Sequence, residues 1–279
     1  MVIDFHSHTF PDRIAQRALT SMQQASHAAA FSDGTVGGLT ASMAAASIDR
    51  CVVLPVATNP AKLVSMNNAS IEQNGRDGLI YFGAMHPQAE DWHQELDRLA
   101  REGIQGIKIH PFYQQTDIGD IRYLRILNRA AELGLITVMH AGSEIAYPGQ
   151  VRCSPEMIKG VLRQVGDIPL VLAHMGGWKN WDRVADCLAG TSVYLDTAIS
   201  LGEIHPIEGQ SYTESDLPLL SEEAFCKLVR LFGSHRILFG TDSPWSDQAK
   251  TLEAIRALPL SQDELDNILS KNACALLHM

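Results

Sequence analysis

The sequence lacks the features that mark membrane and disulfide-stabilised proteins. No apolar run is long enough for a membrane-spanning helix, and the chain passes from Met1 straight into an apolar segment that contains an acidic residue. The five cysteines are an odd number, are widely spaced and include no C-X-X-C pair, which argues against a disulfide framework. These absences favour a cytoplasmic protein with reduced, mostly buried thiols.

Positive charge is also scarce. The 279 residues include 22 Lys and Arg against 32 Asp and Glu, which gives a formal net charge of −10 at pH 7, and the basic residues are scattered. A protein that binds a nucleic-acid backbone needs a basic face. We therefore expect a small-molecule substrate and neither a nucleic-acid nor a membrane partner. The oligomeric state stays open, although homodimers are common among soluble enzymes.

Short apolar runs bounded by turn residues alternate with amphipathic stretches along the whole chain. The runs predict eight strands, at residues 2–6, 51–56, 79–85, 106–110, 135–140, 169–174, 192–196 and 236–242. The amphipathic stretches predict helices at about 11–24, 38–47, 60–75, 89–102, 120–133, 154–165, 180–189, 221–232 and 248–257. We interpret residues 25–47 as a loop followed by a helix.

This alternation predicts an α/β fold. Near-continuous apolar strands separated by helices form parallel sheets that are buried on both faces, and eight such units are the number in a (β/α)₈ TIM barrel. A doubly wound open sheet is the competing architecture, but the chain has neither G-X-G-X-X-G after its first strand nor a phosphate-binding G-X-X-X-X-G-K-[ST]. We expect one domain over residues 1–279, with an extra C-terminal helix that "SQDE" at 261–264 opens as a capping box.

Polar residues stand at the carboxyl ends of the predicted strands. They are His6 and His8 in "DFHSH", His110, His140, His174 and Asp242. In a barrel these ends share one rim, on which catalytic sites of this fold are built. A single buried histidine is usually structural, but four strands that end in histidine and a fifth that ends in aspartate indicate a metal site.

The ligand types favour a borderline divalent cation. Imidazole and carboxylate suit Zn²⁺, with Mn²⁺, Fe²⁺ and Co²⁺ as alternatives. Such an ion lowers the pKa of its bound water to about 7. Asp242 could both ligate the ion and move the proton of that water. Asp4, on the same strand face as His6, is better interpreted as a group that orients a ligand than as a stray buried charge.

The sequence resembles the amidohydrolase superfamily, in the branch called amidohydrolase 2. The matching segments are "DFHSH" (4–8), "GIKIHP" (106–111), "VMHAG" (138–142), "LAHMGG" (172–177), "VYLDTA" (193–198), "RILFGTDSPW" (236–245) and "KNACALL" (271–277). The resemblance implies that one metal is bound by His6, His8, His140 and Asp242, while His174 orients water or substrate. In binuclear relatives the histidines at the positions of His140 and His174 hold a second ion, so that one or two ions are expected.

Lys108 lies where binuclear relatives carry a bridging group. It has three interpretations: a carboxylated bridge between two metals, a free ammonium that binds an anionic substrate group, or a structural lysine paired with an acid. We favour substrate binding for Lys108, with His110 facing the same way two residues later. Arg152, Tyr147 and Trp178, in loops after strands five and six, are either substrate contacts or ordinary loop packing. The segment 198–217 could act as a partial lid, and we interpret its His205 as a solvated loop residue.

We consider three functions from different classes. The first is a metal-dependent hydrolase, in which a metal-activated water attacks an amide, lactone or ester-like bond of a small anionic molecule. The second is a metal-dependent, non-oxidative decarboxylase of an aromatic or unsaturated carboxylic acid, because the resemblance extends to such lyases. The third, a binding barrel without catalysis, predicts a missing ligand, and none of the expected ligands is missing.

Overall fold

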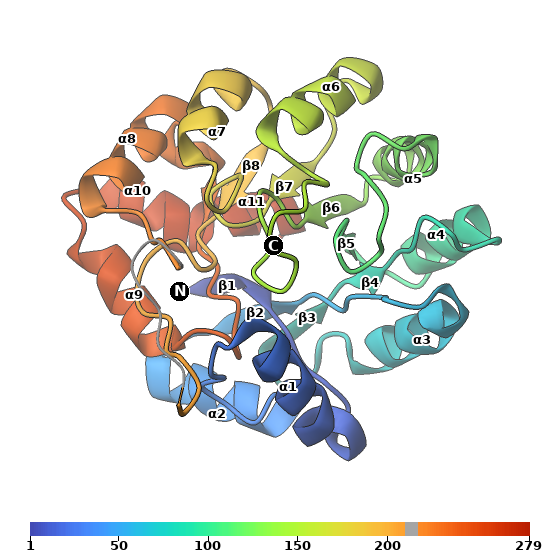
Figure 1. The fold of residues 1–279 in the computed structure, drawn as a ribbon, viewed down its shortest axis with the longest axis horizontal. Helices are drawn as coiled ribbons and strands as arrows, with labels where there is room; N and C mark the ends of the chain where they lie inside the picture. The colour runs from blue at the N-terminus through green and yellow to red at the C-terminus, as the bar shows by residue number, and fades with distance from the viewer. Residues whose placement is uncertain (210–216) are drawn as a thin grey trace. The chain divides into compact units, whose positions relative to one another are not determined.

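The structure is a computed structural model that describes residues 1–209 and 217–279 (Figure 1). The contacts within the chain divide it into two compact units. Unit 1 comprises Met1–Val53 and Asp196–Met279, and unit 2 comprises Leu54–Leu195. The sequence-based expectation of a single domain stays a prediction.

The strands of unit 1 form its buried centre. All five residues of β1 (Ile3–Ser7) are buried, and β1 pairs in parallel with β2 (Arg50–Val53). On its other edge β1 is bonded to the segment that follows β9 (Ile237–Leu238), since the Phe5 N–H donates to the Phe239 carbonyl oxygen (2.7 Å). The first and last strands of the chain are therefore neighbours, and the groups that follow them emerge side by side.

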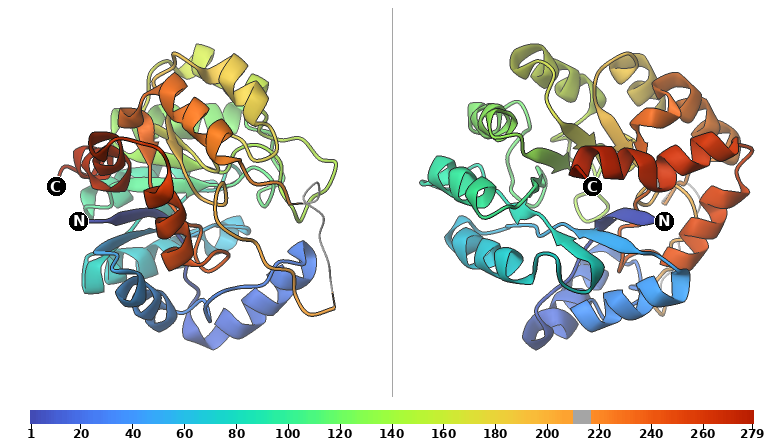
Figure 2. Two further views of the ribbon diagram at one scale, coloured as in Figure 1. Left: turned by 90° about the vertical axis from the view of Figure 1, so that its left-hand side faces the viewer. Right: turned by 180° about the vertical axis from the view of Figure 1, so that it is seen from behind.

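The helices of unit 1 follow the predicted segments closely. They are α1 (Asp12–Ser26), α2 (Val36–Ala46), α8 (Glu222–Phe232), α9 (Gln248–Ala257), α10 (Gln262–Asp266) and α11 (Asn272–Leu277), with the short turns η3 (Ser234–Arg236) and η4 (Asn267–Lys271). A loop and then α2 occupy residues 27–46, as expected. The predicted capping box is confirmed, because the Ser261 side chain accepts from the Glu264 N–H while the Glu264 side chain accepts from the Ser261 N–H. The C-terminal helices run past the amino-terminal ends of β1 and β9 (Figure 2).

The strands of unit 2 follow one another in a parallel array. They are β3 (Leu79–Tyr81), β4 (Gly83–Ala84), β5 (Gly106–Ile109), β6 (Ile136–Met139), β7 (Leu170–Leu172) and β8 (Tyr194–Asp196, whose last residue belongs to unit 1). Strands β4 to β8 pair in sequence order. The single strand predicted at 79–85 is two short strands. The buried Asn67 side chain bonds both the N–H and the carbonyl oxygen of Ala84, and so takes the place of a backbone neighbour there.

The helices of unit 2 cover the outer side of these strands (Figure 1). They are α3 (Leu63–Gln73), α4 (Trp92–Arg101), α5 (Ile121–Glu132), α6 (Pro155–Val165) and α7 (Trp181–Leu188), with the short turns η1 (Pro60–Lys62) and η2 (Arg76–Gly78). Each presents apolar residues to the interior. Helix α6 begins as its sequence suggests, because Ser154 caps the Met157 N–H and Pro155 occupies the first helical position.

Two composition-based expectations can be compared with the fold. All five cysteines are free thiols, four of them buried and Cys274 partly exposed, which confirms the absence of a disulfide framework. Within residues 1–209 and 217–279, no helix is both long and apolar enough to cross a membrane.

Candidate metal centre

Histidine and aspartate side chains stand at the carboxyl ends of the strands, as the sequence predicted. His6 lies on β1, His8 directly follows it, and Asp242 comes shortly after β9. In unit 2, a histidine follows each of the consecutive strands β5, β6 and β7: His110, His140 and His174. Ligands of α/β proteins bind at the carboxyl ends of parallel strands, so each unit has candidate ligands where a site would be built.

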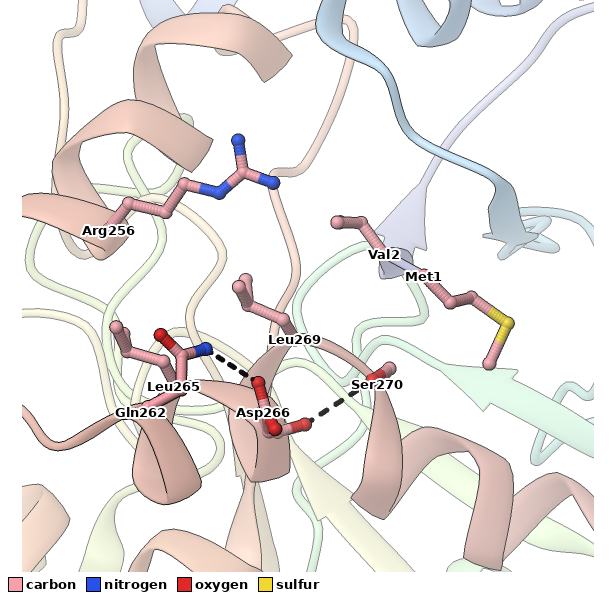
Figure 3. A pocket seen from close by; sticks show the side chains of 8 residues that line it. All are labelled: Met1, Val2, Arg256, Gln262, Leu265, Asp266, Leu269 and Ser270. Atoms are coloured by element: carbon pink, nitrogen blue, oxygen red, sulfur yellow. Dashed lines mark hydrogen bonds between the residues drawn. The ribbon is translucent and has the colours of Figure 1, made fainter.

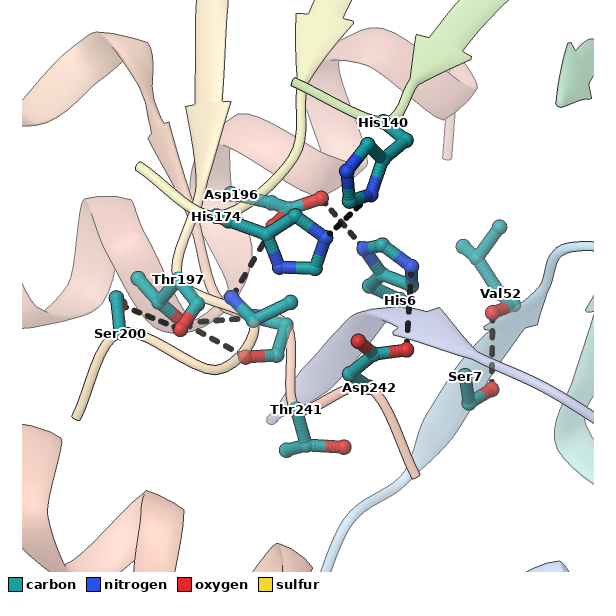
Figure 4. Close-up of polar contacts among 12 residues, drawn as sticks. His6, Ser7, Val52, His140, His174, Asp196, Thr197, Ser200, Thr241 and Asp242 are labelled. Carbon is teal, nitrogen blue, oxygen red and sulfur yellow. Dashed lines mark hydrogen bonds and ion pairs between the residues drawn. The ribbon is translucent and has the colours of Figure 1, made fainter. Parts of the chain in front are cut away.

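Three ligand atoms converge in unit 1. His8 Nε2 lies 3.0 Å and His6 Nε2 lies 3.5 Å from Asp242 Oδ1, and the two Nε2 atoms are 3.2 Å apart. Figure 4 shows Asp242 facing His6. Ligands held about 2.1 Å from one ion are separated by about 3.0–3.5 Å in octahedral or tetrahedral geometry. The three atoms therefore fit a single divalent cation.

Asp196 orients the His6 ring. Its Oδ2 accepts a hydrogen bond from His6 Nδ1 (2.8 Å), both side chains are buried, and its Oδ1 accepts from the Ala198 N–H (3.1 Å) (Figure 4). A proton on Nδ1 leaves the lone pair of Nε2 directed at His8 and Asp242. This carboxylate–histidine arrangement is the usual support of a metal-binding imidazole. Sequence reasoning missed the role of Asp196, although it ends the seventh predicted strand.

Asp4 hydrogen-bonds the main chain next to two of the converging residues, His6 and Asp242. It accepts from the His6 N–H (3.0 Å), the Thr241 N–H (3.0 Å) and the Gln248 side chain (2.7 Å). Burial raises the pKa of Asp4 to about 6, against the lowering effect of these hydrogen bonds. The suggestion that Asp4 orients a ligand is supported, but it acts on the main chain next to His6 and Asp242 and not on an imidazole.

The backbone at two candidate site residues is in a rarely populated conformation. Asp242 has φ 66° and His174 has φ 59°, both in the left-handed region that non-glycine residues seldom adopt. The Asp242 N–H donates to the His6 carbonyl oxygen (2.7 Å), which connects the backbone at Asp242 to β1. Such strained residues cost about 1–3 kcal/mol each and gather at functional sites.

The unit 2 histidines form a second cluster. His140 Nδ1 lies 3.1 Å from His174 Nε2 (Figure 4), and His140 Nε2 lies 3.0 Å from the Ser143 carbonyl oxygen. Burial, and then the nearby His110, His174 and Lys108, hold the pKa of His140 well below its usual value, against the opposing effect of Glu144. A neutral imidazole is the form that can ligate a metal.

Lys108 and His110 lie on the same side of β5, as their spacing predicts. Lys108 is 1% exposed, and it is close enough to His140 to lower the pKa of that ring. The rings of His110 and His140 are stacked with centroids 4.2 Å apart. The Lys108 side chain therefore lies near His140. Its three interpretations stay open, and substrate binding stays a prediction.

Glu144 is a second residue that sequence reasoning missed. Its Oε2 lies 3.4 Å from His110 Nε2 and 3.6 Å from His140 Nε2, and the side chain is 9% exposed. It comes four residues after His140, in the loop that follows β6. Loop positions carry no periodic signal, so only its spacing from His140 could have drawn attention to it.

The loop residues proposed as substrate contacts have partners within unit 2. The Arg152 Nη1 donates to Asp117 Oδ1 (3.1 Å). The Tyr147 ring lies 5.6 Å from that of Tyr113, and Trp178 is 5% exposed with the Lys179 ammonium 4.7 Å from its ring centroid. Substrate contact by Arg152, Tyr147 and Trp178 stays a prediction.

The segment proposed as a lid is described only in part, because residues 210–216 lie outside the described residues. Within the described part, His205 Nε2 lies 2.7 Å from Glu203 Oε2, and the His205 side chain is 48% exposed. That agrees with the interpretation of His205 as a solvated loop histidine.

A cavity of unit 1 lies away from these groups. It has a volume of about 360 Å³ and is formed by the start of the chain together with α9, α10 and η4 (Figure 3). Arg256 and Asp266 are the charged side chains in its lining, and Asp266 is bonded to Gln262. None of the candidate ligands lines it, so this cavity contributes nothing to the metal centre.

The chain belongs to the amidohydrolase family. The family model described as amidohydrolase matches residues 3–279, nearly the whole chain. This confirms the resemblance carried by "DFHSH", "GIKIHP" and "FGTD". No curated protein matches the chain by sequence.

Solved structures show the fold. An uncharacterised TIM-barrel protein from Bordetella bronchiseptica is 18% identical with a TM-score of 0.73, over 99% of this chain and 98% of that one. A candidate 2-pyrone-4,6-dicarboxylic acid hydrolase from Pseudomonas putida is 18% identical with a TM-score of 0.65, over 99% and 97%. A 5-carboxyvanillate decarboxylase from Novosphingobium aromaticivorans with bound manganese is 14% identical with a TM-score of 0.69, over 100% and 97%. The chain thus has the predicted (β/α)₈ TIM-barrel fold.

Proposed function

We propose that this chain is a metal-dependent hydrolase that adds water across an amide, lactone or ester-like bond of a small anionic molecule. The observation that carries the proposal is the convergence of His6 Nε2, His8 Nε2 and Asp242 Oδ1 within 3.0–3.5 Å, with His6 oriented by the buried Asp196. The family supports it, because amidohydrolases are hydrolytic by description. So does the likeness to a candidate 2-pyrone-4,6-dicarboxylic acid hydrolase.

The trio would hold a divalent cation, and the family resemblance adds His140 to its ligands and His174 beside it. Zn²⁺ suits these donors, with Mn²⁺, Fe²⁺ and Co²⁺ as alternatives and one or two ions per chain. When bound, the cation lowers the pKa of water and polarises a carbonyl oxygen.

The protein residues have separate roles in this proposal. Asp242 takes the proton of the attacking water and passes it to the leaving group. His174 orients the water or the substrate. Lys108, with His110 and Arg152, binds the anionic group of the substrate.

The second candidate is a non-oxidative decarboxylase of an aromatic or unsaturated acid. It is favoured by the likeness to a 5-carboxyvanillate decarboxylase with bound manganese, over the whole of this chain. The same ligands would serve both reactions. What differs is the product, because a hydrolase incorporates water whereas a decarboxylase releases CO₂.

One experiment tests the metal and separates the two reactions. Purified protein is analysed for Zn, Mn, Fe and Co, then assayed before and after chelation on lactones, esters and carboxylated aromatic acids in ¹⁸O water, with CO₂ release followed in parallel. We expect chelation and the His6→Ala substitution each to lower the rate at least a hundredfold. The wild-type reaction should incorporate ¹⁸O into the product.

A matched control is His93→Ala, since His93 is an exposed histidine on helix α4. This variant should keep both metal and rate. An activity that survives chelation, or a His6→Ala protein with full metal content, contradicts the proposal. Release of CO₂ without uptake of ¹⁸O favours the decarboxylase.

A further inference from the structure

Gln114 places a buried amide at the carboxyl ends of two strands of unit 2. It lies four residues after His110, in the turn that follows β5, and it is 2% exposed. Its Oε1 accepts from the His110 N–H (3.0 Å) and from the Tyr123 hydroxyl (2.6 Å). Its Nε2 donates to the carbonyl oxygens of Ala57 (3.0 Å) and Met85 (2.5 Å). The two acceptor and two donor positions of the amide are therefore all used within unit 2.

The amide occupies the place of a backbone hydrogen bond between β4 and β5. Ala84 pairs with Lys108 in the parallel ladder, and the Met85 N–H donates to the Lys108 carbonyl oxygen (3.2 Å). In a regular parallel ladder the next bond would run from the His110 N–H to the Met85 carbonyl oxygen. Instead, the His110 N–H donates to Gln114 Oε1, and Gln114 Nε2 donates to the Met85 oxygen. The amide is thus inserted between the two strand ends.

The partners of the amide explain why residue 114 is a glutamine. The side chain must offer an acceptor to two donors and donors to two carbonyl oxygens. Carboxylates lack the donors, ammonium and guanidinium groups lack the acceptor, and a hydroxyl has a single donor. Burial raises the pKa of Tyr123, which keeps its hydroxyl protonated as a donor. A primary amide satisfies all four partners at once.

Gln114 also fixes both main-chain groups of His110. The His110 N–H donates to the Gln114 side chain, and the His110 carbonyl oxygen accepts from the Gln114 N–H (3.0 Å). The His110 ring stacks on His140 with centroids 4.2 Å apart and lies 4.3 Å from the Tyr113 ring. A shift of the main chain at His110 would carry its ring out of this stack.

We propose that Gln114 is a positioning residue whose inserted amide sets the separation of the β4 and β5 ends and so fixes where the His110 ring lies. This placement stands on the contacts of unit 2 alone. A consequence for substrate rests on the proposed function, in which Lys108 and His110 bind the anionic group. Such binding acts on substrate and transition state alike, so loss of Gln114 should change KM more than kcat.

The inserted amide is tested first in wild-type protein, metal-free or loaded with Zn²⁺. Scalar couplings across hydrogen bonds, measured by NMR on isotope-labelled protein, identify the carbonyl group that accepts from a given amide. We expect the His110 amide nitrogen to couple to the side-chain carbonyl carbon of Gln114. Coupling to the Met85 carbonyl carbon, or to neither carbon, overturns the proposal. This measurement does not depend on the folding of any variant.

The test variant is Gln114→Met, which removes the amide and keeps a side chain of similar length. The direct bond from the His110 N–H to the Met85 carbonyl oxygen can then form, which moves His110 towards β4. We expect the ring resonances of His110 to shift. KM for an anionic substrate should rise about tenfold, the effect of one misplaced hydrogen bond to a charged group, while kcat stays within about threefold.

The matched control is Tyr123→Phe. This substitution removes one bond to the same Oε1 and leaves the bonds of Gln114 to the strand ends in place. Like Gln114→Met it should lower the urea midpoint, but the His110 ring resonances and KM should match the wild type. A merely structural effect would move both variants alike, and it would lower kcat through the active fraction without raising KM.

Two further results overturn the role of Gln114. They are unshifted His110 ring resonances in Gln114→Met, and an unchanged KM in this variant of an active enzyme. A wild type that binds no cation, or that acts on none of the assayed substrates, overturns the proposed function instead. In that case the wild-type coupling and the ring resonances still decide whether Gln114 places His110.

Discussion

The substitution Asp196→Asn tests the metal centre at its most buried contact. Asp196 is 0% exposed and accepts the His6 Nδ1 hydrogen bond at 2.8 Å, while its second oxygen accepts from the Ala198 N–H. Asparagine has the same shape but only one acceptor oxygen. If that oxygen keeps Ala198, the amide NH₂ faces His6 and drives the proton onto Nε2, which blocks the metal-binding lone pair.

The other amide orientation keeps His6 but places two donors together at Ala198. In either case a buried hydrogen bond is lost, which costs about 1–3 kcal/mol of unfolding free energy. Loss of a group that orients a metal-binding histidine weakens metal affinity about 10- to 100-fold, or about 1.4–2.8 kcal/mol. We therefore expect both quantities to fall in Asp196→Asn.

The assay is a competition titration of Zn²⁺ or Mn²⁺ against a chelator, with urea unfolding of the metal-free protein alongside. Asp263→Asn is the charge control, because Asp263 lies in the same unit with a side chain 94% exposed. It should match the wild type in both measurements. An Asp196→Asn protein that binds metal within twofold of the wild type refutes the reasoning about the His6 tautomer.

Three further predictions concern stability. Gly106→Ala should lower the unfolding free energy by about 1–3 kcal/mol, because its new Cβ meets the Phe82 ring and a β6 carbonyl oxygen. Gly160→Ala, with open space around it in helix α6, should raise the unfolding free energy by up to about 1 kcal/mol. The urea midpoints of the two variants test this, and equal shifts would contradict the close packing at Gly106. Asp120→Ala removes the N-cap of α5 and should cost about 1 kcal/mol at pH 7. The bond to Arg122 lowers the Asp120 pKa from 3.8 to about 2. The stabilisation by Asp120 is therefore present above pH 3.8 and is lost as pH falls towards 2. A loss of unfolding free energy in Asp120→Ala that stays constant from about pH 7 to about pH 3 would contradict this pH dependence. Metal at 100 times its Kd should stabilise the wild type by about 2.7 kcal/mol and His8→Ala much less; equal stabilisation of both in urea unfolding would remove His8 from the ligands.

Much of the fold could be predicted because its signals are local. Apolar runs and amphipathic periods marked the strands and helices, and the serine caps at Ser154 and Ser261 lie where the sequence placed them. The strand predicted at 79–85 is the informative exception. It is two short strands, and the second is bonded at Ala84 by the side chain of Asn67, 17 residues away, a contact that no local pattern reports.

For the site, the sequence by itself determined which residues end the strands, and hence the donor set His6, His8 and Asp242. The strand period fixes where a side chain emerges, and the chemistry of imidazole and carboxylate then points to a metal. Only the tertiary structure decided which nitrogen of each ring is available. Asp196 meets His6 across 190 residues of sequence, and Glu144 turns towards two rings from a loop without periodicity. A tautomer is set by the partner of the opposite nitrogen, and that partner is chosen by folding.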